Sequence, residues 1–259
     1  MRAQRWWIGF VGLFVVGLLA GLALYGERSI DTMSTPDHAL NSFVQDQGIL
    51  YVRIEEHQAQ RGLSIALGGG QMRPLTTIHE FWLDAQNPWR IRRVTSELLE
   101  DGPHLIFADG SDGNTGWWSV DWAKGQSAPE RGEGRYPLLE QSKTELSFDV
   151  WIRGFWRDGQ TWLNRLHDGK AMQVGEAEQG RWGHVLLLQA NEAGYVVTAT
   201  VRAETPNILV EKITVDSNGI LQKAQRITNW DWLDPTQLGD DFWMNPPADV
   251  PIGSGALKP

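Results

Sequence analysis

An unbroken apolar run opens the chain. It extends from Trp6 to Tyr25 and follows two arginines. At a helical rise of about 1.5 Å per residue, such a run covers about 30 Å, the thickness of the hydrocarbon core of a bilayer. The run is longer than the core of a cleaved signal peptide, and the basic residues before it favour an N-terminus on the cytoplasmic side. We therefore predict that residues 1–28 form a single-pass signal anchor in the cell membrane, with the rest on the extracytoplasmic (periplasmic or extracellular) side. Cleavage near the small residues at 20–23 is the alternative.

The pattern changes twice after this run. Residues 29–34 are polar and read as a linker, and apolar positions then recur at helical spacing from Thr35 until Gly48. From Ile49 the period becomes two, which predicts a strand that is buried on one side. Further strands are expected at 76–83, 89–95, 104–108, 118–122, 171–178, 183–189, 194–203, 207–215 and 219–228. Turn-forming residues at 84–88, 109–114 and 217–219 indicate hairpins between neighbouring strands.

Three other stretches depart from the strand pattern. Residues 60–75 and 123–135 are rich in glycine or charge and are predicted to be loops. Apolar residues return to helical spacing from Phe148, but Gly154 and Gly159 predict that this helix is short or broken. The pattern therefore predicts one domain at 35–230 and an irregular C-terminal tail at 231–259.

Composition excludes several classes of function. The chain has a formal net charge of −9 and a pI near 5.1. Binding to nucleic acid needs a basic surface, so we expect no nucleic-acid partner. The chain has no cysteine, which rules out disulfides, thiolate zinc sites, iron–sulfur clusters and cysteine nucleophiles.

Candidate catalytic and metal-binding residues do not form a recognised motif. The chain has no nucleophile elbow, and its histidines lack metal-ligand spacing; they are His38, His57, His79, His104, His167 and His184. Asp109, Asp112 and Asn114 could bind calcium, although the same residues are ordinary turn formers. The carboxylates of Asp84, Glu97, Glu100 and Asp101 could act on a glycosidic bond, although acidic residues at strand ends are usually only solvated. We expect no enzyme activity, no metal and no cofactor.

Tryptophan is the unusual component of this chain, which has fourteen. Trp117 and Trp118 are adjacent on a predicted strand, so their side chains should point to opposite faces of the sheet. One should line the inside, while the other should be exposed or covered by a helix. Tryptophans could also stack on sugars or anchor a protein partner.

Three pairs of segments carry a resemblance to a known family. They are 80–84 with 87–92, 107–110 with 116–120, and 213–216 with 219–221. In this order they resemble the paired strands of the periplasmic lipoprotein-carrier superfamily, which includes LolA-like and RseB-like domains. The chain departs from the pattern at Val120, where the family has an aromatic residue, and in the length of the loop at 60–75.

The resemblance implies a mainly β (α+β) fold, a curved antiparallel half-barrel with helices covering the concave face. It also implies a non-enzymatic protein that holds a lipid, acyl chain or apolar peptide in the concavity. We predict that the lining residues are Trp82, Trp118, Val120, Trp122, Phe155 and Trp156. Two alternatives stay open: an envelope sensor or membrane-complex subunit with a membrane-protein partner, and a carbohydrate-binding domain.

Overall fold

The computed structural model describes residues 48–59, 74–121, 131–137 and 148–244. The predicted anchor, the linker, the helix before Gly48 and most of the predicted loop at 60–75 lie outside these residues. The elements in chain order are β1 (Ile49–Gln58), β2 (Leu75–Asp84), β3 (Arg90–Leu99), β4 (Gly102–Asp112), β5 (Thr115–Asp121), β6 (Arg131–Pro137), α4 (Phe148–His167), β7 (Met172–Glu178), β8 (His184–Glu192), β9 (Tyr195–Arg202), β10 (Leu209–Val215), β11 (Leu221–Leu233) and α5 (Asp240–Met244). Short 3-10 turns lie at Gly180–Trp182 and Pro235–Gln237.

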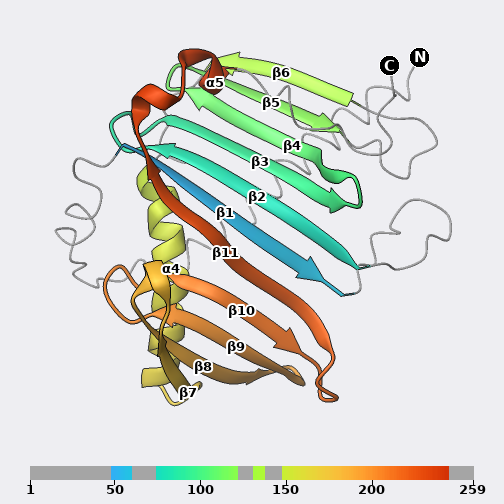
Figure 1. Cartoon of the computed structure of the whole chain (residues 1–259), viewed down its shortest axis with the longest axis vertical. Coiled ribbons are helices and arrows are strands. Elements are labelled where there is room, and N and C mark those ends of the chain that lie inside the picture. Colours follow the sequence, from blue (N-terminus) through green and yellow to red (C-terminus); the bar gives the residue numbers. More distant parts are fainter. Residues whose placement is uncertain (1–47, 60–73, 122–130, 138–147, 245–259) are drawn as a thin grey trace. The chain divides into compact units, whose positions relative to one another are not determined.

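The strands form one antiparallel sheet of eleven strands, in the order β6-β5-β4-β3-β2-β1-β11-β10-β9-β8-β7. Every neighbour follows directly in sequence except β1 and β11, which pair over the full length of β1. The sheet is open and curved, with β6 and β7 at its two ends (Figure 1). The prediction of a mainly β protein with a large antiparallel sheet is confirmed.

Alternation along the strands gives the sheet two distinct faces. Leu50 pairs with Leu83 and Val52 with Phe81, and these side chains pack in one buried cluster with Ile152 of α4. We call this side the α4 face. Between them Tyr51 pairs with Trp82 on the other side, where Phe242 of α5 contacts the Trp82 ring. We call this side the α5 face.

The predicted turns form because side-chain oxygens accept backbone N–H groups there. The Asp84 carboxylate accepts from Gln86 and Asn87, and Asp112 accepts from Asn114 and Thr115. Both turns are Asx turns, which fix the reversal between paired strands. The hairpin predicted at 217–219 is confirmed between β10 and β11, where Gly219 has a φ of 78°.

Three expectations about local structure were wrong. The helix from Phe148 is continuous over 20 residues, because the two glycines inside it do not interrupt its backbone. Residues 131–135, predicted as loop, belong to β6, which pairs with β5. The stretch after residue 230, predicted as irregular, extends β11 to Leu233 and then forms α5, which packs against β3, β4 and β5.

Candidate functional site

Among the described residues, the amphipathic helix α4 packs on part of the α4 face of the sheet. Ile152 near the start of α4 is buried among strand residues of β1 and β2, and Trp162 in its second half is buried against β8 and β9. These residues recur at helical spacing, so a single apolar stripe of α4 lies along the sheet. Gly159 lies where α4 approaches the backbone of Asn207 so closely that a side chain would not fit, and the stripe stays in contact with the sheet there. A Cβ there would lie 2.0 Å from the carbonyl oxygen of Asn207.

Two aromatic residues of α4 occupy the centre of this layer. The Phe155 ring packs edge-on against Phe81, with centroids 5.8 Å apart, and against Trp230 at 5.6 Å. Trp156 packs against the same cluster. Its indole N–H is buried and has no hydrogen-bond partner among the described residues. An unpaired buried donor costs about 1–3 kcal/mol, so this side chain is not in its best environment.

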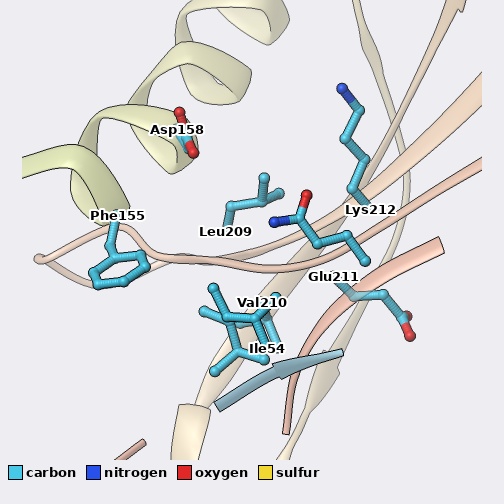
Figure 2. A pocket seen from close by; sticks show the side chains of 9 residues that line it. Ile54, Phe155, Asp158, Leu209, Val210, Glu211 and Lys212 are labelled. Carbon is cyan, nitrogen blue, oxygen red and sulfur yellow. The ribbon is translucent and has the colours of Figure 1, made fainter. Parts of the chain in front are cut away.

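A small hollow lies where α4 crosses β1, β10 and β11. Its volume is about 60 Å³, and its lining residues are Ile54, Phe155, Asp158, Leu209, Val210, Glu211, Lys212, Gln225 and Ile227 (Figure 2). Sites for drug-sized ligands usually measure roughly 300–1,000 Å³. The hollow as it stands therefore has room for only a few atoms.

The hollow has an apolar floor and a charged mouth. Ile54 and Val210 form the floor, while Asp158 of α4 and Lys212 of β10 lie toward its rim (Figure 2). Phe155 and Ile227 also line the hollow. Loss of solvent raises the pKa of the Asp158 carboxyl above its usual value, and the positive charges of Arg157 and Lys212 act in the opposite direction. The site thus combines apolar contact with two opposite charges.

Among the predicted lining residues whose side chains the structure describes, only Phe155 lines the hollow. Phe155 and Trp156 lie between α4 and the sheet. Trp82 lies on the α5 face, and Trp118 lies on the α4 face of β5, where it is 37% exposed. The backbone of Val120 pairs with Phe107, and Trp122 lies outside the described residues. The alternation rule separated Trp117 from Trp118 correctly, but no sequence signal told which face each neighbouring strand presents.

A second aromatic cluster, on the α5 face, was missed from sequence. Arg92 donates to the carbonyl oxygen of Phe242, and its guanidinium carbon lies 4.2 Å from the centroid of the Phe242 ring. Trp82 and Trp117 flank the same guanidinium at 5.9 and 5.6 Å. This cluster attaches α5 to the sheet. The only sequence signal was the apolar Phe242–Trp243 pair in an otherwise polar tail.

Four of the other candidate residues, Asp84, Asp101, Asp109 and Asp112, have structural partners. Asp109 forms a bidentate ion pair with Arg93, and Asp101 lies 2.7 Å from the His104 ring nitrogen. Asp84 and Asp112 hold turns, as described above. Within the described ranges, no group of three or more histidine or acidic side chains could hold a metal ion.

No helix in the part of the chain that the structure describes is long and apolar enough to cross a membrane. The predicted anchor at 1–28 lies outside that part and stays a prediction.

Comparisons with known proteins give distant likenesses only. No family model and no curated protein matches the chain. Among solved structures, an uncharacterized conserved protein from Thermus thermophilus is 7% identical with a TM-score of 0.36, covering 83% of this chain and 96% of that one. A putative outer membrane lipoprotein-sorting protein domain from Vibrio parahaemolyticus is 8% identical with a TM-score of 0.25, covering 80% and 94%. A DUF1329 family protein from Desulfovibrio piger ATCC 29098 is 10% identical with a TM-score of 0.24, covering 80% and 94%. At these TM-scores the likenesses establish neither a family nor a function for this chain.

Proposed function

We propose that this chain is a non-enzymatic binding protein of the cell envelope that holds an acyl chain or another apolar segment between α4 and the sheet. The observation that carries the proposal is the packing of α4, an amphipathic helix laid over the apolar face of an open sheet. An open sheet needs a cover for its apolar face, and a ligand of the same character can replace part of that cover.

The free energy lost when α4 side chains leave the sheet is comparable to the free energy gained when an acyl chain is buried there. Each methylene group that an acyl chain buries gains about 0.8 kcal/mol, so a chain of eight gains about 6 kcal/mol. Burying one large apolar side chain gains about 1.5–3 kcal/mol. Displacing Phe155 and Trp156 from the sheet would therefore cost about as much as an acyl chain returns. The indole N–H of Trp156, which has no hydrogen-bond partner among the described residues, lowers that cost further, because it gains a partner on exposure to water.

The membrane tether is part of the proposal. The apolar run of residues 6–25 would hold the binding domain close to the outer surface of the cell membrane. An apolar ligand is then available by lateral transfer and need not cross water as a monomer.

Uptake of a fluorescent acyl probe tests this proposal. The full chain, held in a non-ionic amphipol, should bind the probe saturably. Because the Phe155 ring and the ligand compete for the same place, Phe155→Ala should bind the probe more tightly than the wild-type protein. Trp118→Ala is the matched control, since Trp118 lines no part of the hollow, and should leave binding unchanged. Circular dichroism confirms that each variant is folded. Absence of saturable uptake, or the same affinity in the Phe155 variant, would contradict the proposal.

A second candidate is a subunit of a membrane complex that uses the same sheet for protein contacts. Its support is Trp118, which is exposed on β5 next to the end strand β6, since exposed tryptophan is a frequent anchor of protein interfaces. In that case Trp118→Ala would lose a co-purifying membrane protein while probe uptake stayed absent or unchanged.

A further inference from the structure

The mouth of the hollow holds two opposite charges on different elements. Asp158 belongs to α4, and Lys212 belongs to β10, next to the apolar floor (Figure 2). Lys212 pairs with Gln225 of β11 on the α4 face, and its ammonium lies 6.0 Å from the centroid of the Trp162 ring. The lysine therefore reaches from the sheet toward the helix.

The two charges do not neutralise each other by direct contact. Among the described residues, Asp158 and Lys212 form no ion pair within 4.0 Å. The neighbouring acid on β10, Glu211, lies 3.7 Å from Arg226 and points away from Asp158 and Lys212 (Figure 2). Arg157 precedes Asp158 on α4 and is the other cation close enough to influence its charge. An anion and a cation thus lie on different elements around the same hollow (Figure 2).

A ligand that fits this arrangement has an apolar tail and a head that carries both charges. We infer that the mouth binds the head group of a zwitterionic phospholipid-type amphiphile, with Lys212 facing its phosphate and Asp158 facing its ammonium. This inference rests on the proposed function, because the tail would enter the space beneath α4. Charge complementarity is the argument for the occupant: a purely anionic head would meet Asp158, and a purely cationic head would meet Lys212.

Asp158 is exposed and Lys212 is half-buried, so a head group at the mouth can reach both charges. The protein atoms around its carboxyl group raise the pKa of Asp158, and the positive charges of Arg157 and Lys212 oppose that shift. A bound ammonium group restores the favourable surroundings of the carboxylate. The head group would bind at the mouth and the tail beneath α4, so the ligand does not need a large preformed cavity.

Three amphiphiles with the same eight-carbon tail test this inference: octylphosphocholine, octyl phosphate and octyltrimethylammonium. The full chain is held in a non-ionic amphipol, and binding is followed by the NMR shifts of the ¹³C-labelled methyl groups of Ile54 and Ile227, which line the hollow. Octylphosphocholine should shift both methyl groups saturably. Each single-charge amphiphile should bind roughly two- to fivefold more weakly, the range expected for one partly exposed charge pair.

Charge variants assign the two contacts. Asp158→Asn should bring octylphosphocholine down to the affinity of octyl phosphate, and Lys212→Gln should bring it down to that of octyltrimethylammonium. Asp168→Asn and Lys170→Gln are matched controls beyond the end of α4, where the two residues pair with each other, and should change nothing.

The outcomes separate the two proposals. If all three amphiphiles shift the methyl groups with equal affinity, or if the charge variants leave the order unchanged, the head-group inference is wrong while the apolar site stands. If none of the three shifts the methyl groups, and the acyl probe is not taken up either, both the inference and the proposed function fail.

Discussion

The indole N–H of Trp117 donates to the main-chain oxygen of Trp243, 126 residues further along the chain, over 2.5 Å. Both side chains are almost completely buried, at 2% and 1% exposure. The bond connects β5 to α5. The guanidinium of Arg92 packs against the Trp117 ring of β5 and the Phe242 ring of α5. Residues 240–244 are therefore part of the folded domain, although their neighbours in sequence are rich in proline and glycine.

Removing the Trp243 side chain should destabilise the domain strongly. Trp243→Ala leaves a large cavity on the α5 face, and such changes typically cost about 3–5 kcal/mol. The free energy of unfolding, measured by urea denaturation, should fall by that amount. Met244→Ala is the control: Met244 is the next residue and is 37% exposed, so its replacement should stay within about 0.5 kcal/mol. Equal effects of the two changes would show that α5 does not pack as described.

The two glycines inside α4 should respond to alanine with opposite signs. A Cβ at Gly159 would lie 2.0 Å from the Asn207 carbonyl oxygen, so Gly159→Ala must push α4 away from the sheet, at a cost of about 1–3 kcal/mol. A Cβ at Gly154 meets nothing within 4 Å. Gly154→Ala should therefore stabilise the protein by about 0.5–1 kcal/mol, through helix propensity alone. Thermal unfolding of the two variants measures both effects, and two shifts of the same sign would contradict the packing of α4.

The same two glycines show where prediction from sequence stops. Their presence predicted a short or broken helix, because glycine lowers helix propensity by about 1 kcal/mol. At Gly159 the lost propensity is offset by close packing on a backbone 48 residues away in sequence, which no local pattern reveals. The strands were easier to predict, because an alternation such as that of Leu50, Val52 and Ile54 is local.

The candidate site shows the same limit. Alternation placed Trp117 and Trp118 on opposite faces, as found. It could not place Trp82 relative to them, because that depends on the register of three successive strand pairs. A shift by one residue in any of these pairs would move Trp82 to the other face. Phe155 and Trp156 were easier to assign, since only one face of an amphipathic helix can cover a sheet.

The ion pair between Arg93 and Asp109 should contribute measurably to stability. The guanidinium donates to both carboxylate oxygens, at 2.9 and 2.7 Å, across the β3–β4 pair, and both side chains are largely buried. A double-mutant cycle of Arg93→Gln and Asp109→Asn should give a coupling energy of about 1–3 kcal/mol, as is usual for bidentate pairs shielded from water. The exposed pair Lys170–Asp168 is the control and should give less than about 1 kcal/mol. Equal coupling in the two cycles would show that the Arg93 pair is as solvated as a surface pair.

Stability at alkaline pH should depend on Tyr51. Its hydroxyl donates to the Glu80 carboxylate over 2.5 Å, and its ring stacks on Trp82. Burial, together with the negative charge of Glu80, raises the pKa of Tyr51 well above its ordinary value of 10.0. The folded state therefore favours the protonated phenol, and the unfolded chain loses its proton first as the pH rises. The stabilisation is fully present below about pH 10 and is lost above it, at a slope of at most about 1.4 kcal/mol per pH unit.

Replacing the hydroxyl should remove this part of the pH dependence. Between about pH 9 and pH 11.5, the free energy of unfolding of Tyr51→Phe should fall less steeply than that of the wild-type protein. Tyr195→Phe is the matched control, because Tyr195 is exposed at the start of β9, and its curve should run parallel to the wild-type curve. Urea denaturation at a series of pH values gives all three curves. If the Tyr51 variant also runs parallel to the wild-type protein, the Tyr51 phenol meets the same solvent in the folded and the unfolded state, and the contact with Glu80 does not persist in solution.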